Sequence, residues 1–136
     1  MAGIAAKIVA QFFESKEMSA QVIDDNVLRL GWDFKGGSMA IFFHFDETDT
    51  HVHLEGYDFI KVPEDKFDNM YKVLNECNDT YTHIKFVLDT KRKEINARDD
   101  DVIQLDTCGP ECLELMIRMV KVVEDAYPTL MKALWA

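Results

Sequence analysis

Four side chains that can bind a metal ion or transfer a proton lie in one short stretch of the sequence: His44, Asp46, His51 and His53. The polar segment Glu47 to Thr50 is typical of a hairpin loop, because Asp and Thr side chains satisfy backbone groups locally. This loop places Asp46 opposite His51 and His44 opposite His53, with all four side chains on one sheet face. Cross-strand Cβ separations of about 5 Å would let them bind a metal such as zinc, in a sensor or a hydrolase.

The residues that alternate with these four favour a different interpretation of the hairpin. Phe43, Phe45, Val52 and Leu54 need the opposite sheet face for the core, which leaves the histidines on the solvent side without any metal. A register slip of one residue would also scatter the four side chains. We therefore predict no metal ion and no cofactor, and keep the His/Asp metal site as the alternative.

Two cysteines near the end of the chain could form a reactive site. Cys108-Gly109-Pro110-Glu111-Cys112 resembles a thioredoxin motif, but that motif has two intervening residues and this run has three. A helix N-terminus lowers a thiol pKa, so Cys108 could react with Cys112 one turn later. The favoured interpretation is a capping turn followed by a buried small residue, and we also expect Cys77 in the core.

Other catalytic signatures are missing from the sequence. The carboxylates of Asp99-Asp100-Asp101 belong to a polar run, which is normally solvated rather than held in a pocket. Gly36-Gly37 lacks the lysine and the helix start of a phosphate-binding loop, and no serine lies in a nucleophile elbow. We therefore predict that the protein is not an enzyme.

The final helix carries more apolar surface than one packed face requires. At about 100° per residue its polar positions share a wedge of roughly 80°, and its apolar positions fill roughly 220° against the roughly 100° of an ordinary amphipathic helix. The wedge contains Glu111, Glu114, Arg118, Lys121 and Asp125, and the arc contains Cys112, Leu113, Leu115, Met116, Ile117, Met119, Val120, Val122, Val123, Ala126 and Tyr127.

Two coverings of this arc are possible, a second protein or the chain's own layers. The first predicts a dimer or client-protein interface at Leu115, Met116, Met119, Val120 and Val123, joined by Trp32, Trp135 and the first helix. The second predicts a helix enclosed within one subunit.

The periodicity along the chain predicts an α+β domain in the order helix, three strands, helix, two strands, helix. The helices are expected at Ala2–Lys16, from Pro63 to about Asn78-Asp79, and after Thr107 as N-cap, with Pro110 in the first turn. The strands are expected in Gln21–Phe34, as one or two strands broken at Asp24-Asp25-Asn26, and at Ser38–Asp46, Thr50–Val62, Ile84–Thr90 and Glu94–Leu105. Together they form an antiparallel sheet of about five strands with the helices packed on it.

Length and charge narrow the class of protein. The 136 residues fit a single domain over 1–136, and a net charge of −10 argues against nucleic acid and anionic membranes as partners. No apolar run reaches the 18 or so residues of a membrane span, and no cleavage site follows the first apolar stretch. An odd number of cysteines, three, fits free thiols, so we expect a cytoplasmic protein.

The element order resembles that of the YbjN-type domains, which look like type III secretion chaperones in fold. The likeness rests on the opening amphipathic helix, the strand Met39-Ala40-Ile41-Phe42-Phe43-His44-Phe45-Asp46 and Pro63 at the start of the second helix. It implies a homodimeric α+β domain with a non-enzymatic, chaperone-like or regulatory role, which could bind a client protein. It transfers no catalytic residue to this chain, and a fold alone does not establish a function.

Overall fold

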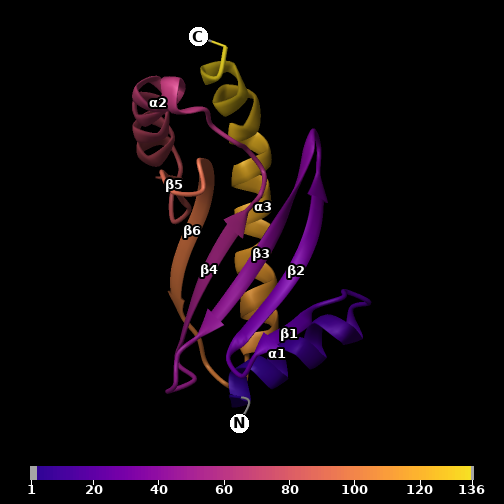
Figure 1. Ribbon diagram of the computed structural model, residues 1–136. Coiled ribbons are helices and arrows are strands. Elements are labelled where there is room, and N and C mark those ends of the chain that lie inside the picture. Colours follow the sequence, from indigo (N-terminus) through magenta and orange to yellow (C-terminus); the bar gives the residue numbers. More distant parts are fainter. Residues whose placement is uncertain (1–2, 136) are drawn as a thin grey trace.

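The computed structural model describes residues 3–135, which form one six-stranded antiparallel sheet and three α-helices (Figure 1). This confirms the predicted α+β class and element order. The elements are α1 (Ile4–Ser15), β1 (Gln21–Asp24), β2 (Val27–Phe34), β3 (Gly37–Phe45), β4 (His51–Tyr57), a 3₁₀ turn η1 (Glu64–Lys66), α2 (Phe67–Thr80), β5 (Lys85–Asp89), β6 (Glu94–Val102) and α3 (Cys108–Ala133).

The sheet has one more strand than the five expected, because the chain turns at Asp25-Asn26 and β1 pairs back onto β2. The strand order across the sheet is β1-β2-β3-β4-β6-β5. A tight turn at Gly36, whose φ of 102° favours glycine, joins β2 to β3. The α2 segment connects β4 to β5, and β6 returns to lie between them.

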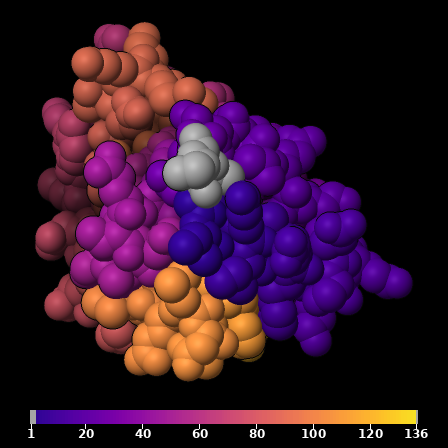
Figure 2. Space-filling view, turned by 90° about the horizontal axis from the view of Figure 1, so that it is seen from below, coloured from indigo at the N-terminus to yellow at the C-terminus, as the bar shows by residue number. Residues whose placement is uncertain are grey.

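Helix α3 runs behind the sheet over most of its length (Figure 1). Helix α1 packs beside its beginning, where Figure 2 shows the indigo helix against the orange start of α3. Helix α2 packs beside its other end, where the Asn69 side-chain amide donates to the Ala133 carbonyl over 2.9 Å. The three helices therefore cover one sheet face, and they leave the other face of the central strands open.

This layering explains the wide apolar arc of α3. The sheet covers one side of the helix while α1 and α2 cover its flanks, so a single chain buries most of the arc. The polar wedge points outward, with Glu114, Lys121 and Asp125 exposed as its composition predicts. Ile117, at 41% exposure, is the most exposed apolar side chain of the arc.

Helix α2 begins at Phe67, after the turn η1, rather than at Pro63, and two strand ends also differ from the predictions. Strand β4 ends at Tyr57 rather than Val62, because Asp58 adopts a φ of 65° and the chain leaves the regular ladder. The segment after it is nevertheless buried at Phe59, Ile60 and Val62, which explains why it has a strand-like pattern. Strand β6 likewise ends at Val102 rather than Leu105.

Helix α3 continues beyond the apolar arc analysed in the sequence and reaches Ala133, with Pro128 inside it. Leu130 and Ala133 beyond the proline are buried, so tertiary packing holds this last part of the helix in place. At the other end, Thr107 occupies the predicted N-cap position, but its side chain makes no capping hydrogen bond.

Among residues 3–135, no helix combines the length and the apolar character needed to cross a lipid bilayer.

Candidate functional site

The predicted histidine hairpin forms in the expected register. His44 lies directly opposite His53 on the open sheet face, with ring centroids 6.0 Å apart, and Phe45 lies opposite Val52 on the face covered by helices. At the tip, Nδ1 of His51 is 3.1 Å from a carboxylate oxygen of Asp46. The four side chains are therefore on one face, but they form two separate pairs.

Asp46 acts as the cap of the hairpin turn. Its carboxylate accepts hydrogen bonds from the Thr48 hydroxyl and from the backbone N–H groups of Thr50 and His51, at 2.6 to 3.1 Å. These bonds, the one from Thr48 foremost, lower the pKa of Asp46 to about 2. Its lone pairs are thus already used in holding the turn.

His53 is held between two carboxylates that the sequence did not associate with it. Nδ1 is 2.6 Å from Asp100 on β6, and Nε2 is 2.6 Å from Glu55 on its own strand. Burial by itself would lower the pKa of His53, but the hydrogen bonds to Glu55 and Asp100 outweigh it and raise this pKa. The pKa of His44 is lowered, mainly by burial, so the pKa values of these two neighbouring rings are shifted in opposite directions.

This geometry gives no support to the alternative of a metal centre. Among residues 3–135, no group of three or more His, Cys, Asp and Glu side chains is arranged to hold a metal ion. His53, Glu55 and Asp100 form a hydrogen-bonded network in which a proton can be held at His53, and the His44 ring lies beside it without a hydrogen bond to the network.

Aromatic rings and arginines continue the open face beside this cluster. Phe42 packs edge-to-face with Tyr57, with ring centroids 5.3 Å apart. The guanidinium carbon of Arg29 is 5.9 Å from the Phe42 centroid, and that of Arg92 is 5.5 Å from the Tyr57 centroid. Local sequence does not mark these residues as a group, because they come from different strands and turns, although Phe42 alternates with the core residues of β3.

Glu94 at the start of β6 is a fully buried carboxylate. Lys61 donates to one of its oxygens over 2.6 Å, and Nε of Arg92 donates to the other over 2.9 Å. Both cations are largely exposed and reach Glu94 from the surface, so its buried charge is compensated at this end of the open face. Nothing in the local sequence distinguishes Glu94 from exposed acids, because its partners come from two different loops.

Asp99 and Asp101 contradict the expectation that residues 99–101 form a solvated run. Alternation with Ile95 and Ala97 places both side chains on the face covered by helices, and Asp99 is only 4% exposed. Burial, then the neighbouring Asp101, raises the pKa of Asp99 to about 7. The sequence does indicate this burial, because the alternation that places Ile95 and Ala97 in the core continues through the acidic run.

The cysteines are buried, as the favoured interpretation predicted. Cys77, Cys108 and Cys112 are all free, and Cys108 and Cys112 have no exposed surface. Burial is the largest effect on each, and it raises the pKa of both thiols despite the helix N-terminus. The reactive-thiol hypothesis for Cys108 therefore finds no support in its surroundings.

The predicted interface residues occupy two different environments. Five side chains of α3 are at most 9% exposed within a single chain: Leu115, Met116, Met119, Val120 and Val123. A partner protein could reach them only if α3 left the sheet. Trp32 on β2 is 36% exposed and stays available at the surface.

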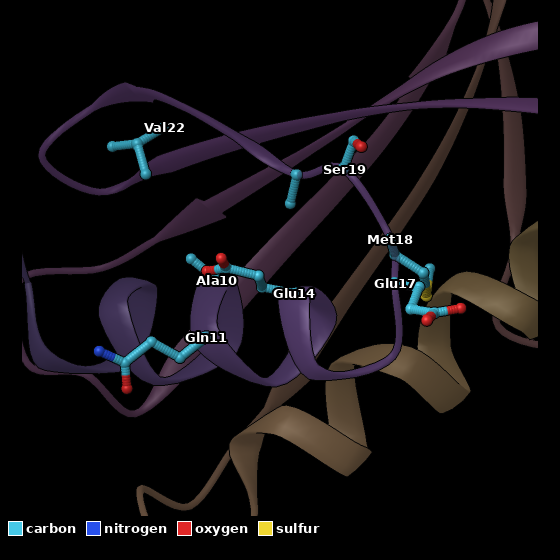
Figure 3. Close-up of a pocket in the computed structure, with 8 residues that line it drawn as sticks. Ala10, Gln11, Glu14, Glu17, Met18, Ser19 and Val22 are labelled. Carbon is cyan, nitrogen blue, oxygen red and sulfur yellow. The ribbon is translucent and has the colours of Figure 1, made fainter.

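A groove of about 550 Å³ lies between α1 and the segment leading into β1 (Figure 3). Ala10, Gln11 and Glu14 line it from the helix, and Met18 and Val22 line it from the returning chain. Ile4 of α1 and Val22 and Ile23 of β1 are more than half exposed nearby. Of the two edge strands, β1 and β5, β1 therefore has the more exposed apolar side chains.

A family model described as "Putative bacterial sensory transduction regulator", named YbjN, matches residues 5–130. The chain belongs to the YbjN family. This confirms the resemblance drawn from the sequence, and the matched region runs from α1 into the last turns of α3.

Among solved structures, the chain is similar to the crystal structure of YbjN, "a putative transcription regulator from E. coli". The TM-score is 0.61 at 13% sequence identity, over 90% of this chain and 91% of the other. At this identity the likeness establishes the YbjN fold alone. No curated protein sequence matches the chain.

Proposed function

We propose that this YbjN-family chain is a non-enzymatic regulatory domain of the cytoplasm that forms homodimers and binds a protein partner. The family description supports a regulatory role. The open face supports a binding role, since Glu55 and Asp100 are engaged with His53 and no described side chain of this face is a nucleophile beside a base. The net charge of −10 favours a protein over a nucleic acid as the partner.

The exposed edge of β1 is the observation that carries the proposal of a homodimer. All four residues of β1 are exposed, and Val22 and Ile23 expose 60% and 53% of their surfaces. Strand edges in soluble monomers are usually protected by charged residues, Pro or a covering element. β1 ends in the charged Asp24 and has a register shift between Val22 and Asp24, but its two central side chains are apolar and exposed. Such an apolar edge is stabilised when another strand pairs with it, and a second copy of the same chain brings an identical strand.

The surface next to this edge supports a role in binding a protein partner. The groove between α1 and β1 is lined by both small apolar and acidic side chains, which fits an extended segment with alternating apolar and basic residues. Glu14 and Glu17 supply its negative charge. Binding there would not require α3 to leave the core.

Light scattering after size-exclusion chromatography tests the homodimer. We expect the wild-type protein at twice the 15.7 kDa of one chain, and the double variant Val22→Asp, Ile23→Asp at the monomer mass. Both positions are exposed, so a folded monomer is expected, and its circular dichroism spectrum should match that of the wild type.

Val102→Asp is the matched control, because Val102 is also an exposed strand residue but lies at the end of β6. This variant should remain dimeric. A wild-type protein that is monomeric at the highest concentration reached, or a double variant that stays dimeric, would contradict the proposed β1 interface.

A further inference from the structure

A shallow trough crosses the open face between the aromatic pair and β2. Gly31 lies opposite Ala40, which lies opposite Tyr57, so two very small residues follow one another across neighbouring strands. Two adjoining hollows of about 300 and 270 Å³ share Arg29, Ala40 and Asp58 as lining residues. We call this feature the Arg29 trough, with its floor at Gly31 and Ala40 and its walls at Arg29, Phe42 and Tyr57.

Space is available at the floor of the Arg29 trough. A Cβ atom built on Gly31 would meet no atom within 4 Å, although the residue lies in the middle of a strand. Residues without a side chain weaken a strand interior, and they are found where another group approaches the backbone closely. The open floor therefore fits the edge or face of a flat ring placed beside Phe42 and Tyr57.

Arg29 supplies a positive charge that the protein itself does not neutralise. Within the described part of the chain it forms no ion pair, and its contact is with the Phe42 ring. Arg92, on the other side of the trough, is already bonded to Glu94. Asp58 also lines the trough, but Arg92 at 3.4 Å and Lys61 at 3.8 Å compensate its charge.

We propose that the Arg29 trough binds a small organic anion that carries a flat aromatic ring. The guanidinium of Arg29 would pair with the anionic group, since its fork matches carboxylate and phosphate oxygens alike. The ring would lie over Ala40 and Gly31 against the aromatic walls. The volume is at the small end of ligand pockets, which fits one or two fused rings rather than a large cofactor.

Amide NMR titration tests this proposal, with indole-3-carboxylate as the probe. We expect saturable shifts at Gly31 and Ala40, and weaker binding of indole or acetate alone, because each lacks one of the two interactions. Adenosine monophosphate, added in a separate titration, distinguishes a phosphate-bearing ligand from a carboxylate-bearing one. Arg29→Gln should weaken binding of the probe by about tenfold or more, the usual scale for loss of a charge-assisted bond.

Gly31→Val provides a second variant that fills the trough without disturbing the core, because the position is open and valine suits a strand. It should abolish binding while the spectrum of the rest of the protein is retained. Thr90→Val, exposed in the turn after β5, should bind as the wild type does. The proposal is overturned if neither ring-bearing anion binds, or if binding is unchanged in Arg29→Gln and Gly31→Val.

Discussion

Two neighbouring aspartates on β6 have different surroundings because their side chains point to opposite faces of the sheet. Asp100 points to the open face, where it is hydrogen-bonded to His53, whereas Asp99 on the covered face has its pKa raised to about 7 and keeps its proton up to neutral pH. Arg118 of α3 lowers the pKa of Asp99, but burial and Asp101 outweigh it. Neighbouring positions in the sequence thus have different surroundings because a strand alternates its side chains.

The raised pKa of Asp99 predicts that stability falls as the pH rises. The folded protein holds the proton up to about pH 7, while the unfolded chain releases it near 3.8. The free energy of unfolding should therefore decrease as the pH rises from 3.8 to about 7, and it should stay low above pH 7. The total decrease is at most about 4 kcal/mol, at roughly 1.4 kcal/mol per pKa unit. Asp99→Asn should be more stable than the wild type at pH 8, by urea unfolding.

Two comparisons check this prediction. The difference between Asp99→Asn and the wild type should shrink towards acidic pH, where the wild-type carboxyl is also neutral. Asp106→Asn, an exposed position, should follow the wild type at every pH. An Asp99→Asn variant that is less stable than the wild type at pH 8 would show that the charged form is the one the fold needs.

At the scale of elements, the close approach of α1 to α3 depends on one glycine. A Cβ on Gly109 would lie 2.6 Å from Cγ and 2.7 Å from Cβ of Phe12. Those atoms are close to the backbone of α1, so the whole helix would have to move. This contact explains why the Ile8 and Phe12 row of α1 is partly buried while Ala5, Val9 and Phe13 fill the core.

Gly109→Ala should therefore destabilise the protein, even though alanine favours a helix more than glycine does. Overpacking of this kind costs about 1 to 3 kcal/mol. Thermal unfolding followed by circular dichroism should show a clear fall in Tm. Gly31→Ala, which adds the same atom in open space, should leave the Tm nearly unchanged, and equal Tm values for the two variants would rule out the tight α1–α3 contact.

At the scale of the whole molecule, three helices are placed on one side of a single sheet. This arrangement encloses the apolar arc of α3 and leaves charged and aromatic side chains of the central strands on the face without helices. The proposed dimer edge and the proposed ligand site are consequently separated in space. The β1 edge lies at the rim of the sheet, and the Arg29 trough lies on its open face.

Aspartate substitutions on α3 distinguish a core helix from an interface helix. Met116→Asp should unfold the protein, because Met116 is 1% exposed and an unpaired buried charge costs several kcal/mol. Ile117→Asp, at 41% exposure, should remain folded and keep its oligomeric state. A folded, monomeric Met116→Asp protein alongside a dimeric wild type would instead place the interface on α3, as first predicted.

The sequence by itself determined what local periodicity encodes. The hairpin register of His44 and His53, the buried cysteines, the element order and the family resemblance all follow from alternation, helical spacing and turn residues over short stretches. The end of β4 at Tyr57 and the helix beyond Pro128 do not follow from the local pattern, because packing against distant elements overrides local preference there.

Only the tertiary structure decided which apolar surface is covered and which charges are paired. A helical arc of Met and Val looks the same whether a sheet, a flanking helix or a second subunit covers it, and the structure assigns it to the sheet, α1 and α2. Likewise Glu94 is paired with Lys61, which is 33 residues away, and the pKa of Asp99 is raised because the fold buries it. Arg29 forms no ion pair within the described chain. Burial and charge compensation depend on contacts between distant segments, and a one-dimensional pattern does not contain those contacts.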